Sequence, residues 1–202
     1  MHRQLLSPCR EFANAFVSNH AYFNQPTTTF YNMQTNKRLF FAFWPSEKQR
    51  QTIESAIAQH KTGLTGKWIS RDHWHVTLVF IANFPDGNIA ALQTATTNIQ
   101  CPTIELRFEQ IYYWARPKIM CLQADFVPNQ LIELVKSLQS TARVFGCKFR
   151  KRNYKAHMTI ARGGQCFNPV SLAQPVELNW SSFHLVESVL TPTGVQYKLL
   201  KQ

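Results

Sequence analysis

The segment HVTLVFIANF (residues 75–84) has a shorter counterpart in HMTIAR (residues 157–162). Each begins with a histidine, carries a threonine two positions later and lies in an apolar run typical of a buried strand. Because side chains alternate along an extended strand, the histidine and the threonine of each segment project on one face, while the residue between them turns into the packing. The two segments therefore predict two strands that each present an imidazole beside a hydroxyl.

Two such strands across a groove would supply the groups that hydrolysis of a cyclic phosphate needs. One imidazole can take a proton from water while the other protonates the departing ribose oxygen, and histidine suits both roles near neutral pH. His75 and His157 are the predicted catalytic residues. The hydroxyls of Thr77 and Thr159 are predicted to bind the phosphoryl oxygens. No metal ion and no cofactor is expected. A single H-x-T is more often an ordinary polar pair of a strand, so the prediction depends on both copies.

Elements of similar type occur in similar order around both segments. Strands are predicted at residues 38–44, 67–70, 74–82, 103–114, 118–125, 156–162, 180–190 and 195–200, and helices at 45–60, 87–98 and 128–145. Ser46 is the expected N-cap of the first helix. The order predicts an α+β fold, bilobal, with two antiparallel-sheet lobes and outer helices. Low identity between the halves leaves their internal duplication a hypothesis.

The composition is that of a globular, basic protein. Hydrophobic residues make up 45% of the 202 residues and charged residues 16%, so the chain can bury enough apolar surface to fold. The formal net charge of +11 favours polyanionic partners, either a nucleic acid or an anionic membrane surface. No stretch approaches the length of about 18 apolar residues that could span a bilayer, so no membrane insertion is expected.

The ends of the chain and its cysteines bear on organisation and location. The five cysteines are odd in number and lack paired spacing, which fits reduced thiols in a cytoplasmic protein. Residues 1–36 are expected to form a mobile extension or to precede a true start at Met33, although an acid-poor N-terminus also resembles a transit peptide. Residues 37–202 are expected to form a single domain of two lobes, and the protein is expected to be a monomer.

From about residue 38 to residue 202, the chain resembles the 2H phosphoesterases. Within them it is most similar to the bacterial RNA 2',3'-cyclic phosphodiesterases, historically called 2'-5' RNA ligases. The resemblance is carried, in chain order, by RLFFAFWP, HVTLVFIANF, RPKIMCL, KAHMTIAR, LNWSSFHLVES and GVQYKLL. The chain departs from the usual pattern at Ala156, where proline is common, and at Ile81-Ala82, where Leu-Gly is common. Both departures affect the stiffness of the backbone and leave the reacting groups in place.

The resemblance implies a bilobal fold whose motif strands meet in a central groove. It also implies hydrolysis of RNA 2',3'-cyclic phosphate ends to 2'-phosphates without a cofactor, with weak reversible 2'-5' ligation as a side activity. His75 with Thr77 would form one half of the site, and His157 with Thr159 the other. We assign His75 as the acid and His157 as the base, but the two motifs are too symmetric for the sequence to decide between this assignment and its reverse.

Further candidates lie near the motifs. Residues 148–155 form a basic run with interleaved aromatics, in which Arg152 and Tyr154 are possible RNA contacts; a solvated run of charges is the alternative. Arg162 is predicted either to bind a phosphate or to brace its strand. His73 shares the parity of His75, and a surface position is favoured over a place in the groove.

Two other functions remain open. The same fold and chemistry would also suit a phosphodiesterase acting on small cyclic nucleotides, which would show little dependence on salt. A non-catalytic RNA-binding module is the third possibility, and it would bind RNA without turnover. The presence of both H-x-T segments argues against the third possibility, because a binding module has no chemical need for two histidines.

Overall fold

The computed structural model of the protein describes residues 35–192 and 194–200, so the expected N-terminal extension, residues 1–36, lies almost wholly outside the described residues. The strands are β1 (Asn36–Phe43), β2 (Lys67–Trp68), β3 (Val76–Pro85), β4 (Ile104–Trp114), β5 (Ile119–Gln123), β6 (His157–Arg162), β7 (Val170–Trp180), β8 (His184–Thr191) and β9 (Gly194–Leu200). The helices are α1 (Glu47–Ala58), α2 (Ile89–Thr96) and α3 (Asn129–Val144), with the 3-10 turns η1 (Arg71–His73) and η2 (Asp86–Asn88).

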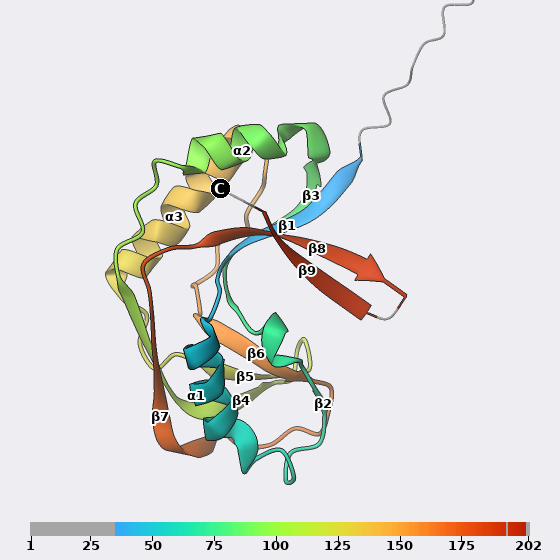
Figure 1. Cartoon of the computed structure of the whole chain (residues 1–202), viewed down its shortest axis with the longest axis vertical. Coiled ribbons are helices and arrows are strands. Elements are labelled where there is room, and N and C mark those ends of the chain that lie inside the picture. The colour runs from blue at the N-terminus through green and yellow to red at the C-terminus, as the bar shows by residue number, and fades with distance from the viewer. Residues whose placement is uncertain (1–34, 193, 201–202) are drawn as a thin grey trace, which may run out of the picture. The chain divides into compact units, whose positions relative to one another are not determined.

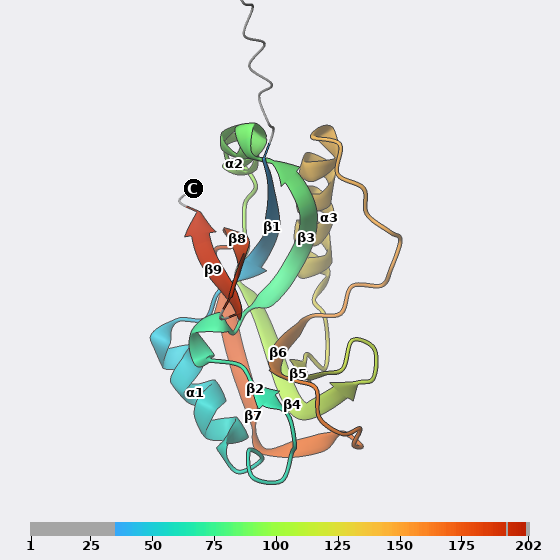
Figure 2. The same ribbon diagram turned by 90° about the vertical axis from the view of Figure 1, so that its right-hand side faces the viewer.

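The described strands join one antiparallel sheet (Figure 1, Figure 2). Its order is β7-β4-β5-β6-β3-β1-β8-β9, and β2 pairs with the end of β6. The two motif strands, β3 and β6, are neighbours at the centre and pair through Val76 and Met158. One half of the sheet runs outward from β3 and the other from β6. The predicted α+β fold with antiparallel lobes is therefore confirmed, and the two lobes share a single sheet.

Each half of the sheet is covered by a helix of the other half. α1 follows β1 in the chain but packs against β7, and α3 follows β5 but packs against β3 and α2. Figure 1 shows α1 beside β7 at the lower end and α3 with α2 beside β3 at the upper end. The buried face of α3 carries Leu131, Leu134 and Leu138 at helical spacing. The apolar face of a helix from one half of the chain is thus buried against the sheet of the other half. An internal duplication with exchanged helices would have this arrangement.

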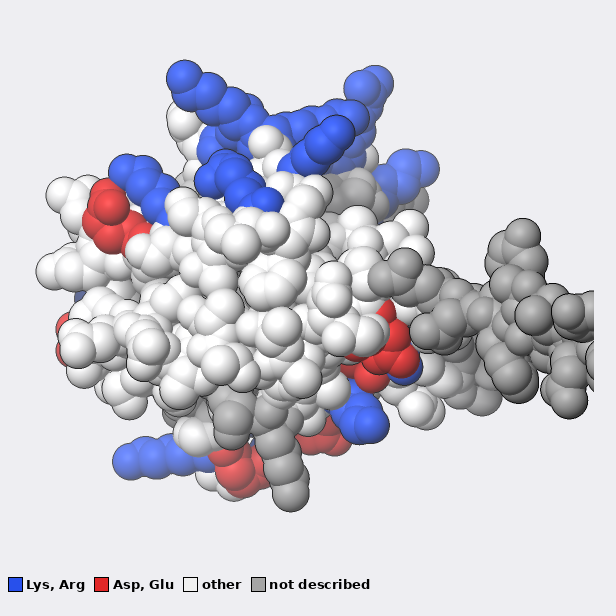
Figure 3. Space-filling view, turned by 90° about the horizontal axis from the view of Figure 1, so that it is seen from above, with Lys and Arg blue, Asp and Glu red and all other residues white. Residues whose placement is uncertain are grey.

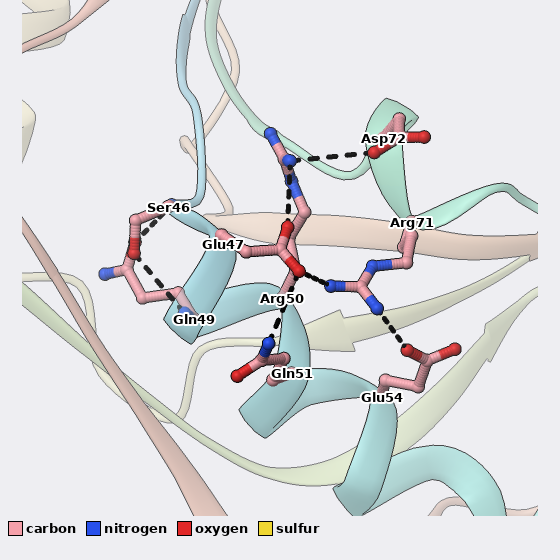
Figure 4. A network of polar contacts seen from close by, with 8 residues as sticks. All are labelled: Ser46, Glu47, Gln49, Arg50, Gln51, Glu54, Arg71 and Asp72. Carbon is pink, nitrogen blue, oxygen red and sulfur yellow. Dashed lines mark hydrogen bonds and ion pairs between the residues drawn. The ribbon is translucent and has the colours of Figure 1, made fainter.

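Polar contacts fix the start of α1 (Figure 4). The Ser46 hydroxyl accepts a hydrogen bond from the backbone N–H of Gln49, and the Gln49 side chain accepts one from the backbone N–H of Ser46. The predicted N-cap is therefore confirmed, in the form of a capping box. The Gln49 amide also donates to the carbonyl of Asn179 in β7, at 2.7 Å. This bond ties the start of α1 to the other half of the sheet.

A network of ion pairs joins α1 to η1, the turn that leads into the first motif (Figure 4). Arg71 pairs with Glu47 and, at 2.8 Å, with Glu54. Arg50 lies 3.6 Å from Asp72. These side chains are partly exposed, so each pair stabilises the fold by no more than about 1 kcal/mol. Together they fix the turn against the helix.

One strand is absent from the sequence-based prediction. The sequence predicts a strand at residues 180–190, whereas the structure ends β7 at Trp180 and begins β8 at His184. β7 contains Pro175, which removes a backbone donor and argues against a strand. The structure accommodates this proline because β7 pairs only with β4 among the described strands, and Pro175 lies in the irregular stretch between the paired residues Ser171 and Val176.

Two loops touch directly at Gly164, which follows β6. Its φ of +82° is in the left-handed region, and a Cβ at this position would lie 1.7 Å from the carbonyl oxygen of Thr65. The backbone N–H of Gln165 donates to the Thr65 hydroxyl at 3.3 Å. Glycine is needed here both for the backbone conformation and for the close approach.

We expect Gly164→Ala to lower the free energy of unfolding by about 3 kcal/mol or more, because it adds a backbone clash to the strain of a positive φ. Gly146→Ala is the matched control, since Gly146 has a φ of +83° with nothing within 4 Å of the added Cβ. The control should lose only about 1 to 2 kcal/mol. Urea unfolding measures both values, and equal losses would contradict the contact between the loops.

Candidate functional site

A pocket of about 550 Å³ lies where β3 and β6 meet. Its walls come from both halves of the sheet and include residues of β1, β2, β5, β8 and β9, together with η1. His75, Thr77, His157 and Thr159 all line it. The structure thus brings the four residues of the two H-x-T segments into one space.

The register between the motif strands explains this convergence. The central pair of β3 and β6 is fully buried and points away from the pocket. In an antiparallel register the residues flanking that pair lie across from one another, so His75 is opposite Thr159 and Thr77 is opposite His157. The imidazoles are close enough for positive charge on His157 to lower the pKa of His75.

A β-bulge in each motif strand turns a further residue onto the pocket face. The pairing of β3 with β1 shifts at Leu78, and the pairing of β6 with β5 shifts at Ile160. Both extra residues stand three positions after the histidine, and each reverses the alternation of the strand. Phe80 and Arg162, five positions after the two histidines, therefore line the pocket. Regular alternation would have turned both toward the opposite face.

Each motif histidine is held by a backbone carbonyl two residues before it. His75 Nδ1 lies 2.7 Å from the carbonyl oxygen of His73, and His157 Nδ1 lies 2.8 Å from that of Lys155. A carbonyl only accepts, so Nδ1 carries the proton in both rings. Nε2 is then the nitrogen left to accept a proton from a ligand, or to donate one when the ring is charged.

Aromatic rings enclose His75. The Trp44 ring stacks on it in parallel, with centroids 5.4 Å apart and planes 2° apart. The ring centroids of Phe40 and Tyr197 lie 4.9 Å and 5.1 Å from that of His75, and the Tyr197 contact is edge-to-face. Burial, above all, lowers the pKa of His75 to about 4, although the hydrogen bond to His73 opposes this. The ring is therefore neutral at pH 7.

His157 has a smaller aromatic support. The Trp114 ring lies 4.4 Å from it, and the Lys155 ammonium lies 5.9 Å from the Trp114 centroid. Burial also lowers the pKa of His157, against the effect of its hydrogen bond to the Lys155 carbonyl. A tryptophan therefore backs each motif histidine, and nothing in the spacing of Trp44 or Trp114 marks either residue in the sequence.

Of the three predicted RNA or phosphate contacts, Arg162, Arg152 and Tyr154, only Arg162 lines the pocket. Arg152 is exposed. Tyr154 is half-buried against the core, and its hydroxyl donates to the carbonyl of Thr77 at 2.9 Å. Burial raises the pKa of this hydroxyl. Tyr154, in the segment just before β6, is thus hydrogen-bonded to β3 and ties the two motif strands together.

His73 corrects an expectation. The sequence favours a surface position for it, but the structure places it on the pocket wall, where its ring lies 5.1 Å from Tyr197. The reason is η1, the turn that ends at His73 and folds back against α1.

In residues 35–192 and 194–200, no group of three or more His, Cys, Asp or Glu side chains is arranged to hold a metal ion. Over the same ranges, no helix has the length and apolar character needed to cross a membrane.

Comparison with known proteins identifies similar chains. Residues 43–120 match the family described as LigT like Phosphoesterase. A curated relative from Archaeoglobus fulgidus, named RNA 2',3'-cyclic phosphodiesterase, is 22% identical over 175 residues, which cover 81% of this chain and 98% of the relative. A relative of the same name from Thermotoga maritima is 23% identical over 176 residues, which cover 81% of this chain and 92% of the relative.

Two solved structures of E. coli LigT also match the fold of this chain. E. coli LigT complexed with 3'-AMP matches with a TM-score of 0.74 and 25% identity, over 82% of this chain and 96% of that chain. E. coli LigT complexed with NADP+ matches with a TM-score of 0.72 and 26% identity, over 83% of this chain and 96% of that one.

The lowered pKa of His75 predicts a pH dependence of stability. The ring has a pKa of about 6.5 when unfolded and about 4 when folded, so the unfolded state binds the extra proton between these values. Stability is then lost as the pH falls from about 7 to about 4. We expect His75→Asn to lose less stability than the wild type over this range, by about 1 to 3 kcal/mol.

Urea unfolding at several pH values measures this difference. His60→Asn is the control, because His60 lies at the end of α1, away from the pocket, and should keep the pH dependence of the wild type. An identical pH dependence in the wild type and in His75→Asn would contradict the burial of a neutral imidazole.

Proposed function

We propose that this chain, which matches the family of LigT-like phosphoesterases over residues 43–120, hydrolyses the 2',3'-cyclic phosphate ends of RNA to 2'-phosphate ends. His75 and His157 are the acid–base pair. Thr77 and Thr159 bind the phosphoryl oxygens. The substrate class comes from the two curated relatives, which are named RNA 2',3'-cyclic phosphodiesterase.

One observation supports this function above the others: two imidazoles of the same tautomer line one pocket from opposite halves of the sheet. Each leaves Nε2 available, and each has a threonine hydroxyl across the strand pair. Hydrolysis of a phosphodiester needs a proton acceptor at the attacking water and a proton donor at the leaving oxygen. An arrangement with one imidazole on each side of the phosphorus meets both needs.

The proposed reaction is an in-line displacement. His157 Nε2 takes a proton from water as the water oxygen forms a bond to phosphorus. The bond from phosphorus to the ribose O3' breaks, and His75 gives O3' its proton, which leaves the phosphate on O2'. The negative charge of the phosphodiester raises the pKa of His75 and so opposes the effect of burial, and the acid acquires its proton together with the substrate.

The threonines and Arg162 act on the phosphoryl oxygens. Hydroxyl groups fixed on a paired strand need little reorganisation as negative charge develops, and this is the condition for electrostatic stabilisation of a transition state. Arg162, on the pocket wall beyond Thr159, adds a positive charge on the same side.

RNA is the favoured form of the substrate. The formal charge of +11 suits a polyanion, and lysine and arginine side chains gather along one edge of the described surface (Figure 3). A small cyclic nucleotide would use the central groups but not this charge. Weak 2'-5' ligation would be the same displacement with a 5'-hydroxyl in place of water, which forms a 2'-5' phosphodiester as the bond from phosphorus to O3' breaks.

We expect the protein to convert an oligonucleotide with a 2',3'-cyclic phosphate end to a 2'-phosphate end in the presence of a chelator. His75→Ala and His157→Ala should each lower kcat by about 100-fold to 10,000-fold, because each removes one proton transfer. His60→Ala, outside the pocket, should keep full activity. Chromatography of the product ends measures conversion, and an unchanged cyclic end with the wild-type protein would refute the proposal.

A substrate with sulfur in place of O3' tests the assignment of acid and base. A thiolate leaves without protonation, so loss of the acid matters less for this substrate. We expect His75→Ala to regain most of its activity on the sulfur substrate, while His157→Ala stays inactive. The opposite pattern would reverse the two roles. Equal loss on both substrates would argue against acid–base catalysis by either histidine.

A further inference from the structure

The segment that joins α3 to β6 carries the densest positive charge of the chain. Residues 148–155, here called the basic segment, contain five exposed cations and no acid: Lys148, Arg150, Lys151, Arg152 and Lys155. The nearest acids along the chain are Glu133 and Glu177. None of the five cations forms an ion pair with a described residue, whereas other arginines, such as Arg71 and Arg107, are paired with carboxylates. The charge of the basic segment is therefore not compensated within the described structure.

The two aromatic side chains of the basic segment pack against the hydrophobic core. The Arg143 guanidinium lies over the Phe149 ring, 5.4 Å from its centroid. The Tyr154 hydroxyl is bonded to the carbonyl of Thr77. The interleaved aromatics thus fix the segment at two points, and neither ring is left as a surface on which an unpaired base could stack.

The backbone of the basic segment also has free donors. The segment has no regular secondary structure, and none of its N–H groups donates a hydrogen bond to the backbone of another described residue. Lysine and arginine side chains and backbone N–H groups are the donors that proteins direct at phosphate oxygens. The basic segment therefore offers contacts to a phosphate backbone and none to the faces of bases.

The basic segment leads directly to the second motif histidine. Lys155 lies two residues before His157, and its carbonyl accepts from that ring. Arg152 lies five residues before His157, so at most about 17 Å of chain separates them. The segment enters β6 at the end opposite to Arg162, and Figure 2 shows it crossing from α3 to β6 along one side of the molecule.

None of the five cations lines the pocket. A mononucleotide bound at the histidines would therefore make no contact with the basic segment, whereas an RNA that continues beyond its reacting end can reach it. The lysine and arginine side chains that gather along one edge in Figure 3 give this side of the molecule a surface for such a polyanion.

We propose that the basic segment is a second RNA-binding site, outside the pocket, for the phosphate backbone of a double-stranded stem close to the reacting end. This inference rests on the proposed function and adds the class of RNA to it: the cyclic end is unpaired, and the nucleotides before it are paired. Proteins that bind unpaired strands stack the bases on exposed rings. A double strand hides its bases and is bound through its phosphates and 2'-hydroxyls.

An anionic membrane surface is the other polyanion that the net charge of the chain suits. A segment that lies in the membrane interface needs apolar side chains that enter it. The basic segment exposes none, because both of its rings pack against the core. This favours the RNA stem.

Equilibrium binding at several salt concentrations tests the site without turnover. The probe is a fluorescent RNA hairpin with a short 3' overhang that ends in a 2'-phosphate. The combined substitutions Arg150→Gln, Lys151→Gln and Arg152→Gln should weaken binding about tenfold or more and reduce the slope of log affinity against log salt by about 2 to 3, because each removes a contact to phosphate. Unchanged affinity and slope would overturn the site.

A control variant combines Lys48→Gln, Lys61→Gln and Lys198→Gln. It removes the same charge from exposed positions outside the basic segment and outside the pocket. The salt slope of the control should equal that of the wild type, and an equal reduction in both variants would mean that net charge alone attracts the RNA. Thermal unfolding checks both folds, and Lys151→Gln alone, with a slope reduced by about 1, carries the test if the triple variant does not fold.

Two further ligands distinguish the partner. For an RNA of the same length that cannot pair, the loss of affinity in the triple variant should be clearly smaller, and an equal loss on both RNAs would overturn the double-stranded stem. Vesicles of phosphatidylserine and phosphatidylcholine should not bind. Binding of these vesicles by the wild type that the triple variant loses would assign the basic segment to a membrane instead.

Turnover separates this inference from the proposed function. On a mononucleotide 2',3'-cyclic phosphate, the triple variant should keep the kcat/KM of the wild type. On the hairpin with a cyclic end its KM should rise about tenfold with kcat unchanged, because only binding of the stem is lost. Equal losses on both substrates would overturn the second site. If the wild type hydrolyses neither substrate, the proposed function fails, and the salt slopes of hairpin binding still decide whether the basic segment binds RNA.

Discussion

The pairing of β3 with β6 through Val76 and Met158 is the constraint on which the site depends. Because the side-chain period of a strand is two, a slip of one residue in either strand would turn its histidine and threonine into the core and its apolar residues into the pocket. The burial of the central pair opposes such a slip. The packing of the core therefore sets the geometry of the four polar groups.

The surroundings of the histidines combine two opposing effects. Neighbouring aromatic rings and backbone carbonyls hold each imidazole in one orientation and one tautomer, which suits a directed proton transfer. The same burial lowers the pKa of His75 to about 4, so the ring carries no charge at pH 7. The pocket nevertheless has arginine and lysine on its wall. An anion that enters the pocket is attracted by the arginine and lysine side chains of the wall, and its charge then raises the pKa of the imidazole.

Much of the fold and the centre of the site were predictable from the sequence, because both follow from simple periods. Alternation within the two H-x-T segments predicts that His75 and His157 share a face with their threonines, and a serine before an acidic, apolar-periodic run predicts the cap at Ser46. The rest depends on exceptions to those periods. The bulges that turn Phe80 and Arg162 toward the pocket leave no mark in the sequence, and Pro175 hides β7 because an edge strand tolerates what a central strand does not.

The exchange of helices between the halves has a consequence for how such a protein can be built. A chain with only one half would leave its sheet uncovered, and it could bury that sheet only under the helix of a second copy. The present chain has the arrangement that two half-length chains with exchanged helices would have, joined in one polypeptide. Identical subunits would have to place the same residue at both ends of the cavity. Joining them in one polypeptide removes that requirement, and it permits a phenylalanine on one side to face an arginine on the other.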